Sequence, residues 1–431
     1  MTRIALPRKR AAVAVAAALL AAPLMGHPAQ ASTGTTYHLT PDVPGTVPPS
    51  GAQVVQQVPD LKAGDTLHLS GTYNRNILVM DKEGTEGAPI RIIGDNATIN
   101  STQSGLTLMD TSHIEVSGIK VTGGAGNTGI MVWHEDAPTM RNISVDNVTV
   151  EGFRNGLYAG TNSTDAAIIG LRITNSTFSG AVNNNILTHS PLGSRGLRDV
   201  TIDNVTAHSA KGDPTLTDKN SGSGIVLGGV SGGSIRNSLA YNNGLGSVAN
   251  EGPEGIWAYS SDNITIENNV SRDNKTSGVD GNGFGFDIDV HNSVMRNNTS
   301  RNNYGAGYLV YTYGNWHANG NIVENNTSEN DNARPSYSWS PIVVAGDVGG
   351  AGTGYAADTV VRGNTIIQRP GEARCSIYVQ GRVRNLKLEN NTRTGGTCDL
   401  TNKADNPGEV TSKDGGNTPP PATGSLGSLG F

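Results

Sequence analysis

Apolar and polar positions alternate along the chain in units that share one short phrase from residue 145 onward. The phrase is an aliphatic residue, any residue, Asn, and then a small, branched or Asn residue. Gly takes the place of its Asn at Gly118 and Gly363, and successive Asn residues from 147 to 325 are 28, 29, 33, 31, 29 and 28 residues apart. A period of this length predicts a solenoid. The repeated Asn residues are Asn147, Asn175, Asn204, Asn237, Asn268, Asn297, Asn325 and Asn390.

The units have the composition of strands rather than helices. They are rich in Ile, Val and Thr, alternate with period two and are punctuated by Gly or Asn, and no strongly helical stretch separates them. We therefore predict an all-β chain folded as a single-stranded right-handed parallel β-helix, with coils stacked about 4.8 Å apart. The repeated Asn would occupy corners with left-handed backbone and form side-chain ladders, which explains the many Asn-x-Ser/Thr triplets better than glycosylation does.

A second strand recurs in each unit, and its period-two pattern predicts which side chains point inward. We expect one inward column to contain Ile130, Leu157, Ile186, Ile225, Ile256, Phe286, Tyr308, Ile342 and Ile377. A second inward column would contain Val132, Ala159, Thr188, Leu227, Ala258, Ile288, Val310, Val344 and Val379. The first outward column would then be Met131, Tyr158, Leu187, Val226, Trp257, Asp287, Leu309, Val343 and Tyr378. The second would be Trp133, Gly160, His189, Gly228, Tyr259, Asp289, Tyr311, Ala345 and Gln380.

The two ends of the chain differ in composition from the repeats. Basic residues, an apolar run from Ala11 to Leu24 and the small residues Ala29 and Ala31 predict a secretory signal peptide over 1–31. We assign 32–100 to an N-terminal cap and the first coils, 101–400 to the parallel β-helix and 401–431 to a flexible C-terminal tail. A short apolar-periodic stretch from Ala52 to Leu61 predicts a cap helix, because the first coil of a solenoid exposes apolar interior.

The net charge limits the classes of binding partner, and the two cysteines predict a disulfide. Removal of residues 1–31 takes away four basic residues and no acidic ones. The remaining chain therefore has a formal net charge of 27 − 37 = −10. This charge disfavours nucleic acid and anionic membranes as partners, and we expect a soluble extracellular monomer. Cys375 and Cys398 are 23 residues apart, about one repeat, so we expect a disulfide between stacked coils.

Two acids interrupt the otherwise aromatic and aliphatic outward columns. We expect Asp287 and Asp289 to lie on one external face between Trp257, Tyr259 and Tyr311 of the adjacent coils. Aromatic faces stack on sugar rings, and neighbouring carboxyls can divide into an acid and a base, as glycoside hydrolysis requires.

Further polar residues are expected beside this pair. Glu254 and Asp280 are candidates for a second catalytic group, and His189 is a more remote substrate-binding candidate. Three long connections, 206–223, 239–254 and 270–284, flank the pair in sequence. Long insertions that cluster on adjacent coils usually build a binding site.

The opening coils resemble those of secreted β-helix proteins that process polysaccharides. The segments Gly64-Asp65-Thr66-Leu67-His68-Leu69 and Ala88-Pro89-Ile90-Arg91-Ile92-Ile93 are similar to those of the chondroitinase B-like lyases. The resemblance implies the fold and a polysaccharide substrate. The Gly-His-Gly motif of polygalacturonases and the Asp-Pro-His motif of alginate epimerases are missing from the sequence, so the resemblance does not extend to a reaction.

Three functional hypotheses follow. The first is a polysaccharide-degrading glycoside hydrolase with Asp287 and Asp289 as the acid/base centre. The second is a polysaccharide lyase in which Asp280, Asp287 and Asp289 bind Ca²⁺ and Lys219, Lys275 or Arg272 abstracts a proton. The third is a scaffold that binds carbohydrate without chemistry.

Overall fold

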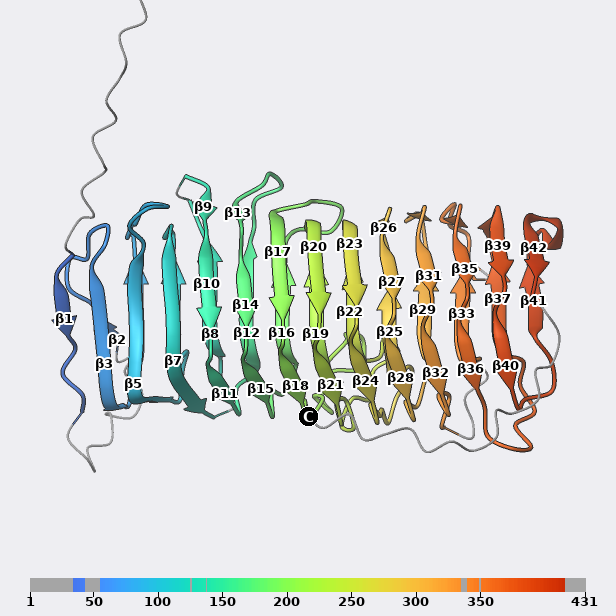
Figure 1. Cartoon of the computed structure of the whole chain (residues 1–431), viewed down its shortest axis with the longest axis horizontal. Helices are drawn as coiled ribbons and strands as arrows, with labels where there is room; N and C mark the ends of the chain where they lie inside the picture. Colours follow the sequence, from blue (N-terminus) through green and yellow to red (C-terminus); the bar gives the residue numbers. More distant parts are fainter. Residues whose placement is uncertain are drawn as a thin grey trace, which may run out of the picture.

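The strands lie across one long axis and follow one another along it in sequence order (Figure 1). The computed structural model describes residues 34–42, 55–124, 126–136, 138–334, 339–348 and 350–414. Within these residues the strands form a 29-stranded and a 13-stranded sheet. Neighbouring strands are parallel, as in the pairs Leu157↔Ile186, Ile225↔Ile256 and Tyr308↔Ile342. This is the parallel β-helix that the repeat predicted.

The smaller sheet carries the second strand of each repeat, and its outer face holds the predicted site. Its strands are β2 (Val55–Gln57), β4 (Asn76–Met80), β6 (Leu106–Met109), β8 (Thr128–His134), β12 (Asn155–Thr161), β16 (Asn184–His189), β19 (Ser223–Gly228), β22 (Glu254–Tyr259), β25 (Asn282–Phe286), β29 (Tyr308–Tyr311), β33 (Ile342–Ala345), β37 (Ile377–Gly381) and β41 (Leu400–Ala404).

The larger sheet forms the other sides of the coils. It contains β1 (Thr36–His38), β3 (Thr66–Tyr73), β5 (Ile90–Ser101), β7 (Ile114–Gly123), β9 (Met140–Arg141), β10 (Ile143–Asp146), β11 (Thr149–Glu151), β13 (Ile168–Ile169), β14 (Arg172–Thr174), β15 (Thr177–Ser179), β17 (Leu197–Asp203), β18 (Thr206–His208), β20 (Val230–Arg236), β21 (Leu239–Tyr241), β23 (Ser261–Glu267), β24 (Val270–Arg272), β26 (Val290–His291), β27 (Val294–Arg296), β28 (Thr299–Arg301), β30 (Ala318–Asn319), β31 (Ile322–Glu324), β32 (Thr327–Glu329), β34 (Ala356–Ala357), β35 (Val360–Arg362), β36 (Thr365–Ile367), β38 (Val383–Arg384), β39 (Leu386–Glu389), β40 (Thr392–Thr394) and β42 (Val410–Lys413).

The corners explain the repeated Asn: the Asn204 side chain donates to Asn175 at 2.8 Å as predicted, and a longer buried ladder lies one residue later. Asn268 has φ 57° and lies exposed at a corner, so its side chain points to solvent. The next residue points inward, and Asn269 donates to Asn298 at 3.1 Å. Asn298 donates in turn to Asn326 at 3.1 Å, and Asn326 to Asn364 at 3.1 Å. These buried amides satisfy one another while they fix the coil spacing.

The predicted cap helix at the N-terminal end is wrong. Val55–Gln57 form strand β2, which pairs with β4 through Val55↔Asn76, and the described residues up to Leu61 contain no helix. This segment serves as the end strand of the smaller sheet, where its backbone groups pair with those of β4. Residues 52–54 and the predicted signal peptide lie outside the described residues.

The C-terminal boundary predicted at residue 400 comes too early. Strand β41 pairs with β37, and β42 pairs with β39, so the coils continue to Lys413. Residues 415–431 of the predicted tail lie outside the described part of the chain. No helix in that described part has the length and hydrophobicity that crossing a bilayer requires.

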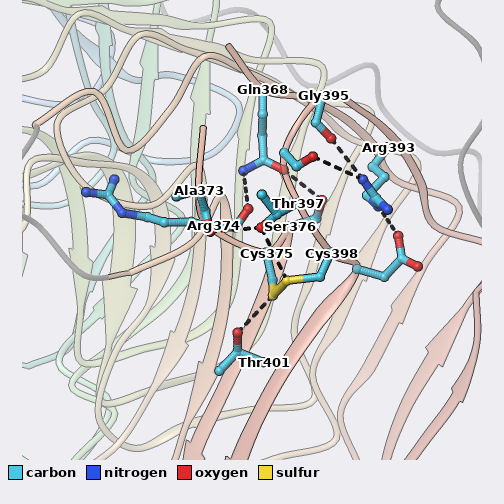
Figure 2. The surroundings of a disulfide bond; sticks show 12 residues. Gln368, Ala373, Arg374, Cys375, Ser376, Arg393, Gly395, Thr397, Cys398 and Thr401 are labelled. Carbon is cyan, nitrogen blue, oxygen red and sulfur yellow. Dashed lines mark hydrogen bonds and ion pairs between the residues drawn. A yellow bond between two sulfur atoms is a disulfide. The ribbon is translucent and has the colours of Figure 1, made fainter. Parts of the chain in front are cut away.

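The predicted disulfide between Cys375 and Cys398 is confirmed, and it joins two stacked coils (Figure 2). The cysteines precede β37 and β41, which pair through Ile377↔Leu400, and their Cα atoms are 4.4 Å apart. The Thr401 hydroxyl donates to the Cys375 sulfur at 3.0 Å. The bond therefore ties the last coils of the helix together.

Candidate functional site

Strand β25 is displaced by two residues from the predicted register. Trp257 lies opposite Gly285, and Ala258 lies opposite Phe286, which in turn lies opposite Val310. Phe284 and Phe286 are therefore the inward residues of this coil, and both are fully buried. The predicted pairing of Asp287 with Trp257, and of Asp289 with Tyr259, is wrong.

The displacement places Asp287 in the row that Asp289 was predicted to occupy. Asp287 follows Phe286 and its backbone N–H donates to Ala258 at 2.9 Å, so it lies between Tyr259 and Tyr311 of the adjacent coils. All three side chains in this row are partly exposed. The row therefore presents one carboxyl between two phenol rings on the outer face of the smaller sheet.

The environment of Asp287 favours its protonated form. Burial is the main cause that raises its pKa to about 7, and the negative charges of Asp280 and Glu251 add to the effect. A hydrogen bond from the Ile288 backbone N–H, at 2.8 Å, opposes the shift. A carboxyl that titrates near neutral pH can deliver a proton under ordinary conditions.

Glu254 lies beneath this row, in the adjacent strand β22. Its side chain is buried, with one oxygen over Gly285, where a Cβ atom would lie 2.0 Å away. Burial raises the pKa of Glu254 well above its usual range, with further contributions from Asp287 and Asp280. Its Oε1 accepts from Asn282 at 3.2 Å, whereas Oε2 has no hydrogen-bond partner among the described residues. Burial therefore favours the neutral form of Glu254.

Two further acids lie in the long connections; Asp280 was among the predicted residues, and Glu251 was not. Asp280 lies in the 273–281 connection and accepts from the Gly252 backbone N–H at 2.8 Å. Glu251 lies in the 242–253 connection and is hydrogen-bonded to Tyr313, which follows β29. Burial raises the pKa of Glu251. The 242–253 and 273–281 connections thus bring acids to the edge of the Asp287 row.

These connections are held against one another by their backbones. The Ser277 N–H donates to the Ser247 carbonyl at 2.9 Å, and the Asn250 N–H donates to the Thr217 carbonyl at 3.2 Å. The stacked 209–222, 242–253 and 273–281 segments therefore form a common wall. A wall that is hydrogen-bonded across three coils can hold acids in place relative to the strands.

Asp289 belongs to a separate network. It lies at a corner with φ 61°, and its carboxylate contacts Arg195 at 3.1 Å, Ser260 at 3.0 Å and His291 at 3.0 Å. Burial opposes ionisation of Asp289, but the hydrogen bonds from His291 and Arg195 outweigh it and lower the pKa. Arg195 also contacts Asp262 at 2.9 Å. The structure therefore does not bring Asp287 and Asp289 together as a pair.

The predicted aromatic residues fall into two groups. Trp257 is only 8% exposed and its indole N–H donates to Ser223 at 3.1 Å, so its ring is part of the wall rather than an open platform. Tyr259 remains partly exposed, and its hydroxyl lies 3.0 Å from His189 Nδ1. Burial lowers the pKa of His189, which is therefore neutral at pH 7.

The three predicted calcium ligands are not grouped in the structure. Among the described residues no three His, Cys, Asp or Glu side chains come together as a metal site. Asp280 and Asp287 approach each other, but Asp289 is held by Arg195 and does not complete the predicted set.

Residues 128–393 match the family model described as a right-handed β-helix region. The chain belongs to this family. No curated protein matches the sequence at a significant level. The handedness that we predicted from the crossover preference is thus confirmed.

Solved structures with low sequence identity share this fold. The mannuronan C-5 epimerase AlgE4 A-module of Azotobacter vinelandii has a TM-score of 0.60 at 15% identity, over 81% of this chain and 91% of that one. The GH136 lacto-N-biosidase of Eubacterium ramulus has a TM-score of 0.53 at 13% identity, over 79% and 63%. DFA-IIIase of Arthrobacter chlorophenolicus A6, without its lid, has a TM-score of 0.52 at 12% identity, over 79% of this chain and 82% of that one. At these identities the likeness establishes the fold alone.

Sequence reasoning missed two residues of this β-helix site. Glu251 lies three residues before Glu254 inside a connection that was correctly expected to flank the site, but nothing in the sequence set it apart. Tyr313 follows Tyr311 by two residues, and that spacing was the available signal for a second ring on the same side. Together the site offers one carboxyl of near-neutral pKa, a buried carboxyl whose pKa is raised and two loop acids, an arrangement suited to proton transfer.

Proposed function

We propose that the chain hydrolyses glycosidic bonds of a neutral extracellular polysaccharide, with Asp287 as the general acid. The observation that carries this proposal is the Tyr259–Asp287–Tyr311 row, in which a partly exposed carboxyl of pKa about 7 lies between two rings. Such rings contact the C–H faces of sugars, and the carboxyl holds a proton for the leaving group. The pair is Asp287 and Asp280 rather than Asp287 and Asp289.

In the proposed reaction Asp287 donates its proton to the glycosidic oxygen as the bond from that oxygen to the anomeric carbon breaks. The Asp280 carboxylate either accepts a proton from the attacking water or attacks the anomeric carbon itself. The anomeric configuration of the first product distinguishes these two routes. Burial raises the pKa of Glu254, which favours its neutral form beside the pair.

The charges favour a neutral sugar over a uronate. Negative charge at Glu251 and Asp280 would repel a polyanionic substrate, and two of the three cations predicted for a lyase are engaged elsewhere. Arg272 contacts Asp273 at 2.7 Å and lies over the Tyr241 ring, and Lys275 lies over the Tyr304 ring. The third predicted cation, Lys219, acts on Glu251, where its charge partly offsets the burial that raises the pKa of that carboxyl. A lyase would instead need a free cation beside the acid row.

Two further observations support an exported carbohydrate enzyme. The mannuronan epimerase and the lacto-N-biosidase with similar folds are carbohydrate-active by name. The disulfide between Cys375 and Cys398 is compatible with an oxidising compartment, which agrees with the predicted signal peptide.

The test is a panel of polysaccharides incubated with the purified full chain. Starch, dextran, laminarin, xylan and galactomannan represent neutral substrates, and alginate and chondroitin represent uronates. We expect new reducing ends from a neutral member, unaffected by a chelator, and no unsaturated product. Unsaturated uronate product that a chelator abolishes would establish the lyase instead, and binding without any product would establish the scaffold.

A further inference from the structure

Three ring side chains extend away from the Asp287 row on the outer face of the smaller sheet. Trp133 in β8 and Tyr158 in β12 have ring centroids 5.9 Å apart and planes inclined by 19°. Tyr158 and His189 in β16 are 6.3 Å apart with planes inclined by 25°. All three are partly exposed. Consecutive strands thus place near-parallel rings side by side along the helix axis.

This ring row is continuous with the proposed site. The Tyr259 ring lies over Gly228, where a Cβ atom would lie 2.3 Å from the ring carbon Cζ. It crosses that strand to reach His189, 3.0 Å from its hydroxyl. From Trp133 to Asp287 there are five strand steps, or about 24 Å at the usual strand spacing. That length accommodates several sugar rings of an extended chain.

Nothing in the β-helix core requires rings at these positions, because they lie on the outer face. The connections that precede β12 and β16 are short, at 152–154 and 180–183, so neither supplies a long segment to cover this part of the sheet. The corresponding side chain in β19, Val226, is only 1% exposed. The rings therefore stay available to a ligand where the following coils are covered.

The chemistry of the row fits an extended neutral polysaccharide. The row consists of aromatic and imidazole rings and contains no Lys or Arg. Its first ring has a polar partner, because the Trp133 indole N–H donates to Glu135. The Glu135 backbone N–H donates to Asp110 at 2.9 Å, which holds this exposed carboxylate beside the ring. Rings bind sugar C–H faces while carboxylates accept hydroxyl hydrogen bonds.

We infer that Trp133, Tyr158 and His189 form additional sugar-binding subsites, so that the protein acts on long neutral polysaccharide chains laid along the β-helix axis. This inference rests on the proposed function for its substrate class, although binding can be measured without turnover. The subsites lie on the N-terminal side of Asp287. The bound polysaccharide would pass over Gly228 and Tyr259 to reach the Asp287 carboxyl.

The experiment compares Trp133→Ala/Tyr158→Ala with Tyr241→Ala, which removes a partly exposed ring from the larger sheet instead. Each is made in the active chain and in the Asp287→Asn background. Binding is measured by retardation in native gels containing starch, dextran, laminarin, xylan or galactomannan. Activity is measured on the retarding polymer and on its shortest cleaved oligosaccharide, and circular dichroism verifies folding.

We expect the double variant to weaken retardation by about tenfold or more, since two stacked rings are lost. Its kcat/KM on the polymer should fall at least about tenfold more than on the shortest oligosaccharide, and Tyr241→Ala should leave this ratio unchanged. Equal losses on both substrates, or unchanged retardation, would overturn the subsites while leaving the hydrolase intact.

Failure of the proposed function would give a different result. A polymer would retard the unaltered protein without being cleaved by it, and the double variant would lose that retardation. This result would keep the ring row as a binding surface and reject hydrolysis. Lack of retardation of the unaltered chain by every neutral polymer would overturn the inference.

Discussion

The outer face of the smaller sheet has an open half and a covered half, although the strands of both halves follow one pattern. In the open half Met131, Tyr158 and Leu187 are partly exposed. In the covered half the corresponding residues include Val226 and Leu309, which are 1% and 2% exposed. The strands are equivalent, so the difference comes from the segments around them: a long connection precedes β19 at Val226, and Leu309 belongs to a buried cluster against which Trp339 packs.

The covered half is where carboxyl chemistry becomes possible. Burial there raises the pKa of both Glu254 and Asp287, because a charged carboxylate loses hydration beneath the long connections. The open half lacks this cover and keeps ring faces in contact with solvent. One repeated strand thus serves binding in one region and proton transfer in another, and the predictions below test that division.

The largest expected effect is on turnover by Asp287→Asn in the covered half. The amide preserves size but cannot donate an acidic proton, so the rate should fall by about 10³-fold or more on the polymer that is cleaved. The matched control is Asp289→Asn, which disrupts the Arg195 network two residues away. It should lower the melting temperature yet keep turnover within about tenfold. Comparable losses of turnover in two well-folded variants would return Asp289 to the catalytic pair.

The second prediction concerns pH. The pKa of Asp287 is about 7 in the folded chain and about 3.9 when unfolded, so the folded state binds this proton more tightly. The free energy of unfolding should therefore decrease as pH rises from about 4 to about 7, by roughly 2–4 kcal/mol from this group, and then level off. Denaturant unfolding at several pH values should show a smaller decrease in Asp287→Asn.

The activity profile tests the same group independently. As a general acid Asp287 must be protonated, so kcat/KM should fall as pH rises through about 7. A rate that instead increases through this range would assign Asp287 the role of base.

The third prediction concerns Gly228, at the boundary between the two halves. In Gly228→Ala the new methyl would meet the Tyr259 ring, which must move and lose its contact with His189. We expect KM to rise by about tenfold with little change in folding, because the ring no longer positions the sugar. Gly87→Ala is the control, since a Cβ there meets nothing within 4 Å. An unchanged KM in Gly228→Ala would separate Tyr259 from substrate binding.

The fold could be predicted from the sequence because its repeats are redundant, but one coil was ambiguous. The segment Gly283-Phe284-Gly285-Phe286 repeats itself every two residues, so two registers both place a Phe inward and a Gly outward. Contacts decide between them: Asn282 lies opposite Glu254 and donates to its carboxyl, and Gly285 leaves room for that carboxyl. Such three-dimensional fit is not contained in a periodic pattern.

The candidate site was predicted only in part for the same reason. Asp287, Tyr259 and Tyr311 belong to columns that alternate along the strands, and the long connections were visible as gaps between repeats. The position of Asp289 was not predictable, because strand β25 ends at Phe286 and the chain turns at this corner. Likewise, the contact of Glu251 with Tyr313 joins loops that no periodicity relates.

The smallest expected effect is that of Glu254→Gln in the buried layer beneath Asp287. Burial raises the pKa of Glu254 and so favours its neutral form, and a neutral amide of similar size can still accept from Asn282. Turnover at pH 6 should stay within about fivefold of the unaltered chain, a change of about 1 kcal/mol in the barrier. A loss as large as that of Asp287→Asn would place the proton donor at Glu254 and move the chemistry from the partly exposed row into the covered layer.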